Sequence, residues 1–229
     1  MSIALSVVIP ALDEAACIGA TLQSLAPSRA RGVEIIVVDG GSTDATRTLA
    51  APWVDRVIEA PNGRSTQLNA GAQAARGRIL LFLHADTQPP DHFDQVILSA
   101  VRDCISAWGR FDVAITGKHR GLKVVSFLMN LRSRATGIAT GDQGIFVTRQ
   151  LFDALQGFPA QPLMEDIEFS KRAKRRATPI CLRETLRTSG RRWERNGLLR
   201  TILLMWRLRL AYFLGTDPAE LRRRYANSR

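Results

Sequence analysis

Short apolar runs alternate with helical patterns through the first half of the chain. Four runs rich in β-branched residues predict strands at residues 5–9, 34–38, 54–59 and 79–83. The segments between them predict helices at residues 15–25, 44–51 and 66–76. Nearly continuous apolar strands linked by helices are typical of a sheet covered on both faces. We therefore predict an α/β fold, a mostly parallel sheet whose ligands bind at the carboxyl ends of the strands.

The pattern changes after residue 117. A basic helical segment, a Gly-rich turn with a short strand, another helix and an extended piece are predicted at residues 122–135, 141–147, 165–176 and 179–182. A basic apolar helix (198–214) and a polar one (218–225) follow, without repeats or low-complexity linkers. We predict one domain, residues 1–190, with halves 1–116 and 117–190, and a basic helical C-terminal appendage, residues 191–229.

Acidic side chains follow three of the predicted strands. Asp13 and Glu14 come after the first, where they could simply begin the next helix. Asp39 comes directly after the second, before two glycines that let the backbone approach a ligand, and Asp86 comes after the fourth. Each could be an ordinary turn residue. Two acids in corresponding positions would repel each other, so a cation bridging a diphosphate is the economical explanation.

Charge is distributed unevenly along the chain. Residues 1–116 contain 9 Lys and Arg against 12 Asp and Glu, whereas residues 117–229 contain 23 against 9. The basic half indicates an anionic partner, namely a phosphorylated small molecule, a membrane surface or nucleic acid, unless it is only a solvated face. Nucleic acid is disfavoured, because aromatic residues make up 7% of the chain and no nucleic-acid-binding motif accompanies the charge.

The cysteines and the apolar segments indicate the cellular compartment in which the protein is expected. Three cysteines form no CxxC pair, so neither a disulfide framework nor a zinc site is predicted. The start of the chain has no basic segment typical of a signal peptide. Three arginines interrupt the apolar stretch 198–214, which indicates a buried, interfacial or subunit-contact helix rather than a spanning one. We expect a cytoplasmic protein, with the C-terminal helix as a possible contact in a homo-oligomer.

Five fragments in order resemble family 2 glycosyltransferases of the GT-A (Rossmann-like) fold: SVVIPALDE, IIVVDGGSTDAT, RSTQLNAGAQAARGRILLFLHADT, GDQGIF and MEDIEFSKRAKR. The resemblance covers residues 3–180. It implies a UDP-sugar donor, UDP-GlcNAc or UDP-glucose, and an inverting transfer. The implied donor-binding residues are Pro10, Ala11, Leu12, Glu14, Asp39, Gly41, Arg64, Gln67, Ala85, Asp86, Asp142 and Gln143.

The resemblance also implies a metal ligand and a catalytic pair. Asp86 matches the last acid of the family's DxD metal motif, but His84 replaces the first, so we expect a weakly bound Mg²⁺ or Mn²⁺. Glu165 and Asp166 match the ED motif, in which Asp166 would be the general base. The alternative is an acidic first turn of a helix.

FLHADT, TGDQGIF and SGRRWERNGLLRT resemble a narrower bacterial group, the radical-SAM/selenodomain-associated transferases 2. This group includes the selenosugar synthase of selenoneine biosynthesis, which implies a selenophosphate acceptor; the group has also been linked to arsenosugars. A basic half-chain suits a small anion. The candidate acceptor-binding residues are Lys118, Arg120, Lys123, Arg191, Arg192 and Trp193, although Trp193 could instead be core.

Three other functions fit parts of the sequence. A UDP-sugar transferase with a lipid-phosphate acceptor at the membrane would explain the basic apolar segment 196–214. A nucleic-acid-binding module would explain the arginine runs. A protein that binds UDP-sugar without transferring it would explain the replacement of an acid by His84.

Overall fold

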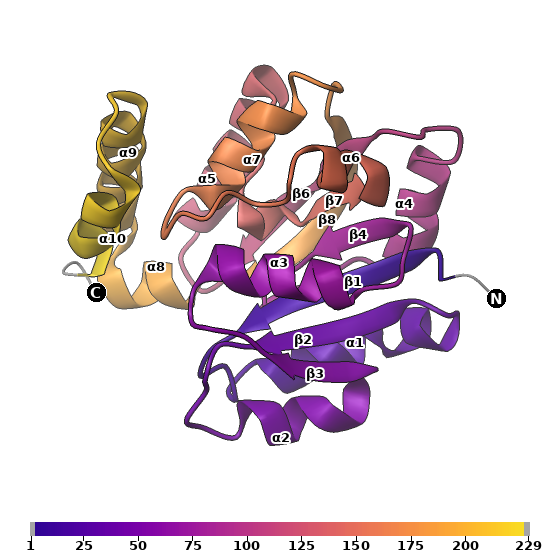
Figure 1. Ribbon diagram of the computed structural model, residues 1–229. Helices are drawn as coiled ribbons and strands as arrows, with labels where there is room; N and C mark the ends of the chain where they lie inside the picture. The colour runs from indigo at the N-terminus through magenta and orange to yellow at the C-terminus, as the bar shows by residue number, and fades with distance from the viewer. Residues whose placement is uncertain (1–2, 227–229) are drawn as a thin grey trace.

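The computed structural model describes residues 3–226, which form one eight-stranded sheet in the order β3-β2-β1-β4-β7-β6-β8-β5 (Figure 1). The first half supplies four parallel strands, β1 (Leu5–Ala11), β2 (Glu34–Asp39), β3 (Arg56–Glu59) and β4 (Ile79–Phe82). The helices between them are α1 (Ile18–Ala30), α2 (Thr46–Ala50) with the 3-10 turn η1 (Ala51–Trp53), and α3 (Arg64–Ala74). All four predicted strands are confirmed: β1, β2 and β4 are buried apolar runs, and β3, at the edge of the sheet, is partly buried.

The second half completes the sheet with β5 (Thr87–Gln88), β6 (Trp108–Thr116), β7 (Ile145–Thr148) and β8 (Ile180–Ser189). Strand β7 runs antiparallel to both β4 and β6, and β5 antiparallel to β8, while β6 and β8 are parallel. The predicted extended piece at 179–182 is the start of a strand that continues to Ser189. The sequence pattern missed β6, because Arg110 and Asp112, which pair with each other, interrupt its apolar alternation.

Helices cover both faces of the sheet, as predicted. Alternate side chains of β1 show this: Val7 and Ile9 pack with α1 and with α4 (Phe93–Ala100), a helix that the sequence analysis missed. Val8 packs on the other face with α3, α6 (Arg149–Ala154) and α7 (Glu165–Ala173). The helix α5 (Gly121–Thr136) lies against β6.

The C-terminal segment is helical throughout its described part: α8 (Arg191–Asn196), α9 (Leu198–Phe213) and α10 (Pro218–Ala226). This segment takes no part in the sheet, and α9 and α10 lie side by side at one edge of the molecule (Figure 1). One end of α9 packs with Leu122 and Val125 of α5, and the other with Met164 and Ile167 at the start of α7. Within residues 3–226, every helix is too short or too polar to cross a bilayer.

A buried carboxylate joins the start of β2 to three other segments, namely β1, β3 and the turn after α3. Glu34 is 2% exposed and accepts hydrogen bonds from Ser6 Oγ (2.5 Å), Arg76 Nε (2.9 Å) and Arg56 Nη2 (3.0 Å). Burial alone would raise the pKa of Glu34, but its hydrogen bonds with Arg76, Ser6 and Arg56 lower it below the ordinary value.

Glu34→Gln is therefore expected to lower the free energy of unfolding at pH 7 by about 3 kcal/mol, because it leaves buried donors without their anionic partner. The lowered pKa makes the contribution of Glu34 complete above the unfolded value of about 4.3, and acid removes it as pH falls through the folded pKa. Urea unfolding between pH 3 and 7 measures both effects. A difference between wild type and variant that is the same at every pH would contradict this account.

Candidate active site

The loops after β1 and β2 are clamped together by side chain to backbone hydrogen bonds. The Asp13 amide donates to Ser42 Oγ (3.0 Å), the Thr43 amide to Asp13 Oδ1 (2.8 Å), and the Glu14 amide to Thr46 Oγ1 (2.8 Å). Asp13 has a left-handed backbone (φ 53°), and α1 begins three residues later than predicted, at Ile18. The acidic pair thus builds a loop at the sheet edge rather than the first turn of a helix.

Asp39 ends β2 and is fully buried. Its Oδ2 atom accepts hydrogen bonds from the backbone amides of Gly41 and Ser42, both at 3.0 Å. Its Oδ1 atom is buried and has no hydrogen-bond partner in the described part of the chain. Since buried polar atoms are normally paired, Oδ1 is suited to accept an N–H from a ligand.

The side chain of Gln67 holds the ends of two strands in place beneath this edge of the sheet. Gln67 on α3 is buried, and its Nε2 atom donates to Ala11 O and Val38 O, both at 2.9 Å. Gln67 therefore lies under the site and positions the ends of β1 and β2. Of the other residues expected here, Leu12 and Gly41 are exposed, while Ala11 and Ala85 are buried and Pro10 is partly buried.

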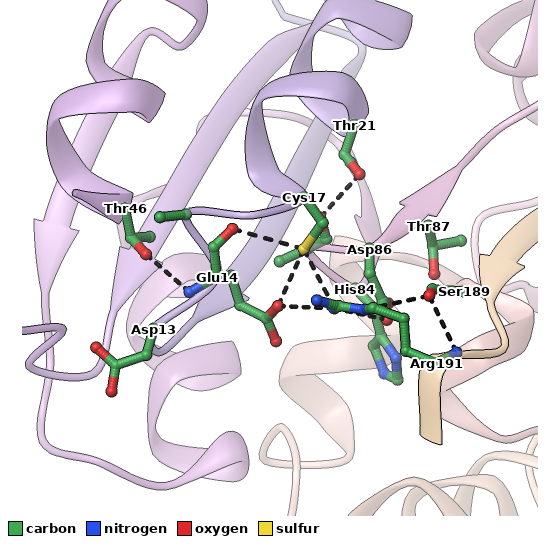
Figure 2. Close-up of polar contacts among 12 residues, drawn as sticks. Asp13, Glu14, Cys17, Thr21, Thr46, His84, Asp86, Thr87, Ser189 and Arg191 are labelled. Carbon is green, nitrogen blue, oxygen red and sulfur yellow. Dashed lines mark hydrogen bonds and ion pairs between the residues drawn. The ribbon is translucent and has the colours of Figure 1, made fainter. Parts of the chain in front are cut away.

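Asp86 lies beside Arg191 and Glu14 (Figure 2). The Arg191 Nη2 atom is 3.1 Å from Glu14 Oε2 and 3.5 Å from Asp86 Oδ2. The acid that shares a cation with Asp86 is thus Glu14, whereas Asp39 is held by backbone amides. Burial, and then the hydrogen bond to Glu14, raise the pKa of the adjacent Cys17 thiol to about 12, which keeps it protonated. Arg191, expected at the acceptor, lies among the carboxylates expected at the donor.

A second cluster of polar side chains lies next to the end of β4. His84 Nδ1 is 3.2 Å from Asp142 Oδ1 and 3.4 Å from Arg64 Nη2. Desolvation alone would raise the pKa of Asp142, but the hydrogen bond and charge of His84, with the charges of Arg64 and Arg192, lower it. Asp142 belongs to the 3-10 turn η2 (Gly141–Gln143), whose Gln143 is buried and bonds back to Thr140 in a capping box.

The first turn of α7 places Glu165 and Asp166 next to this group. Glu165 is buried and its Oε1 lies 3.8 Å from Arg64 Nε. Burial, and then the charge of Asp166, raise the pKa of Glu165. The Gly141 amide donates to Asp166 Oδ2 at 2.8 Å. A small pocket joins these groups, lined by Arg64, His84, Gly141, Glu165 and Asp166 together with apolar side chains.

The remaining residues expected at the acceptor do not form one group with Arg191. Lys118, Arg120 and Lys123 are exposed at the start of α5. Arg192 lies over the ring of Tyr225, with its Cζ 5.0 Å from the centroid. Trp193 is half-buried against an apolar cluster that also contains residues of β6, α5 and α9. The sequence analysis missed Arg132, a half-buried arginine of α5 near Asp166.

The metal-binding capacity of this edge depends on a ligand. Residues 3–226 contain no group of three His, Cys, Asp or Glu side chains arranged to hold an ion by themselves. Mg²⁺ commonly binds one or two carboxylates together with substrate phosphates and water. Asp86, 23% exposed and adjacent to Glu14, fits that kind of site.

Known proteins resemble this chain in sequence. The model of glycosyl transferase family 2 matches residues 6–150. A PGL/p-HBAD biosynthesis glycosyltransferase of Mycobacterium bovis is 40% identical over 88 residues, 35% of this chain and 34% of the relative. The dodecaprenyl-phosphate galacturonate synthase of Rhizobium johnstonii is 29% identical over 162 residues, 62% of this chain and 46% of the relative. The chain thus matches less than half the length of either relative.

Solved structures share the fold. Staphylococcus aureus TarS 1–349 in complex with UDP-GlcNAc superposes with a TM-score of 0.63 at 18% identity, covering 81% of this chain and 58% of TarS 1–349. Glucosyl-3-phosphoglycerate synthase from Mycobacterium tuberculosis, in complex with Mn²⁺, UDP and glucosyl-3-phosphoglycerate, gives 0.60 at 22% identity, covering 80% and 70%. These likenesses confirm the GT-A fold. Since the family model spans more than half of the residues, the chain belongs to glycosyl transferase family 2.

Proposed function

We propose that this chain transfers a sugar from UDP-GlcNAc or UDP-glucose to selenophosphate, with inversion at the anomeric carbon, and so makes a selenosugar. The observation that carries the donor assignment is the buried, unpartnered Oδ1 atom of Asp39. Uracil offers one N–H donor on its pairing edge, which would satisfy this oxygen. Family membership and the structures of relatives with UDP and UDP-GlcNAc support the same donor.

The donor occupies the carboxyl edge of β1, β2 and β4 in this proposal. Asp39 binds the base, the loop of residues 10–14 supports the nucleoside, and Arg64 faces the diphosphate. Residues 1–116 then form the donor half, residues 117–190 the acceptor half, and residues 191–229 a basic appendage that supplies Arg191.

Asp86 would hold a divalent metal together with the diphosphate, and because His84 replaces an acid of the family motif, few side chains of this chain would bind that metal. Structures of glucosyl-3-phosphoglycerate synthase from Mycobacterium tuberculosis with UDP contain Mn²⁺ or Mg²⁺. The metal, when bound, neutralises charge that develops on the leaving UDP. Within residues 3–226, Arg191 is the only side chain that forms an ion pair with Asp86. When the donor binds, Arg191 must either move away from Asp86 or bind the diphosphate together with the metal.

The transfer needs one nucleophile and one leaving group. Selenium of selenophosphate forms the bond to the anomeric carbon, the bond from that carbon to the β-phosphate oxygen breaks, and UDP leaves with the electron pair. The anionic selenium carries no proton that a base must remove. Asp166 then orients Gly141 and the acceptor, whereas a hydroxyl acceptor would need Asp166 as general base.

Asp166→Asn distinguishes these acceptors. With selenophosphate, kcat should fall less than about tenfold, because no proton transfer is lost; with a hydroxyl acceptor it would fall about 10²- to 10⁴-fold. Steady-state kinetics with each acceptor measures the effect, and Asp153→Asn, on α6, is the matched control. A loss above 10²-fold with selenophosphate would contradict the proposed role of Asp166.

The proposed function is tested by mixing the chain with UDP-GlcNAc, magnesium and selenophosphate. We expect stoichiometric UDP and a selenium-containing sugar, detected by mass spectrometry. No UDP with any acceptor would rule out transfer altogether, and UDP formed only with a lipid phosphate would rule out the selenium acceptor.

A lipid-phosphate acceptor is the second candidate, and exposed apolar stripes favour it. On α5 the stripe consists of Val124, Phe127, Leu128 and Leu131. On α9 it consists of Leu199, Leu203, Trp206, Leu210 and Phe213, and Leu214 directly follows the helix. Both helices carry basic but no acidic residues, which suits an anionic bilayer surface. The Rhizobium relative is named for a dodecaprenyl-phosphate substrate. Co-sedimentation with anionic but not neutral vesicles would favour this candidate, and no co-sedimentation would count against it.

A further inference from the structure

Arg132 is an arginine whose charge the fold leaves unpaired. It lies near the end of α5, and its Nε and Nη2 atoms are buried without a hydrogen-bond partner in residues 3–226. A guanidinium presents five N–H donors, and leaving buried donors unsatisfied lowers stability. An arginine with a purely structural role would be expected to use those donors within the fold. The unpaired donors of Arg132 are therefore available to bind a ligand.

Two other arginines and one carboxylate lie near Arg132. Burial, then the charge of Arg209 and, more weakly, of Arg110, lower the pKa of Arg132 to about 10, while the charge of Asp166 opposes them. Arg110 is paired with Asp112. No ion pair within the described residues involves Arg132 or Arg209, so two arginines lie beside Asp166 without an ion pair of their own.

Packing explains why residues so far apart in sequence meet here. Leu208, next to Arg209 on α9, packs with Ile167, the neighbour of Asp166 on α7, and with Ile138, which follows α5. The other end of α9 packs against α5. Arg132 and Arg209 therefore lie at the seam where α5, α7 and α9 converge, close to each other and to Asp166.

We infer that Arg132 and Arg209 bind the phosphate group of the acceptor and present the acceptor beside Asp166. Guanidinium groups bind phosphate oxygens in a bidentate fork, and a dianion would satisfy both arginines at once. This inference rests on the proposed function, since it names the group that the acceptor carries. The residues that recognise the acceptor are then Arg132 on α5 and Arg209 in the C-terminal appendage. The exposed residues near the start of α5 are not part of this site.

A phosphate group fits this seam whether it belongs to a free phosphate compound or to a lipid headgroup. A free compound such as selenophosphate would need only the two arginines. A lipid phosphate would also use the apolar stripes of the same two helices, α5 and α9. Transfer assays with selenophosphate and with a short polyprenyl phosphate in detergent separate the two sources.

The direct test titrates inorganic phosphate into the full chain saturated with UDP, by calorimetry. Arg132→Gln and Arg209→Gln should each weaken phosphate binding about tenfold or more, as expected for a hydrogen bond to a charged group. Arg207→Gln is the matched control, because Arg207 is exposed on the same helix. The control should keep wild-type phosphate affinity, and all three variants should keep wild-type UDP affinity.

Two further readouts separate this role from a structural one. Arg132→Met should leave the melting temperature unchanged or raise it, because the variant removes a buried charge without a partner. In the transfer assay, the KM of the accepted phosphate compound should rise in Arg132→Gln while the KM of the UDP-sugar stays constant.

Phosphate affinity that is unchanged in both Arg132→Gln and Arg209→Gln would overturn the inference, as would an equal loss in Arg207→Gln. A wild-type chain that bound phosphate through Arg132 but did not bind UDP would instead overturn the proposed donor. The two failures are therefore distinguishable.

Discussion

Asp86→Asn is expected to reduce sugar transfer about 10³-fold while the chain remains folded. Asp86 is partly exposed, and its side chain contacts Arg191 across 3.5 Å rather than packing in the core. Its removal takes away the carboxylate that, with the metal, stabilises charge on the leaving diphosphate. UDP release from UDP-GlcNAc measures the loss, and far-UV circular dichroism measures the fold.

Asp91→Asn is the matched control, since Asp91 is an exposed acid five residues further along the chain. It should keep wild-type activity. If Asp86→Asn unfolded the chain, Asp86 would be a structural residue; if the variant kept more than a third of the activity, the metal and diphosphate would not depend on it.

Asp39→Asn is expected to shift nucleotide preference from UDP towards CDP. The Gly41 and Ser42 amides fix Oδ2 of Asp39, so an asparagine must turn its oxygen towards them. Its NH₂ group then points where Oδ1 of Asp39 pointed. An NH₂ facing the N–H of uracil leaves two donors unpaired, whereas the ring nitrogen of cytosine is an acceptor.

We expect UDP affinity to fall about 10²-fold in Asp39→Asn, on the scale of a lost hydrogen bond to a buried charge, and CDP affinity to rise. Competitive displacement of a fluorescent UDP analogue by UDP, CDP and GDP measures the preference. Asp91→Asn should retain the wild-type order. An equal loss of affinity for all three nucleotides would show that Asp39 shapes the loop without reading the base.

The strands of the first half of the chain could be predicted from the sequence for a physical reason. Strands β1, β2 and β4 are buried on both faces, so their residues form continuous apolar runs that cannot be mistaken for loops. A polar residue at or shortly after the end of such a run lies at the sheet edge. The position of Asp39 and Asp86 at that edge could therefore be predicted without any knowledge of tertiary contacts.

The second half of the chain was harder to predict because its structure depends on contacts distant in sequence. Strand β8 contains Arg183, Glu184 and Arg187 and is recognisable as a strand only through its pairing with β6. Arg191 reaches Glu14 across 177 positions of sequence. The unpaired donors of Arg132 have no sequence signature either, because an arginine on an amphipathic helix normally lies in solvent.

The most direct test of the central claim, that the carboxylates after β2 and β4 hold a UDP-sugar, is calorimetric titration of UDP into the wild-type chain with magnesium. We expect one UDP molecule to bind per chain, UDP-GlcNAc to displace it, and the removal of magnesium to weaken its binding. No UDP binding, or UDP binding no stronger than that of GDP, would contradict it.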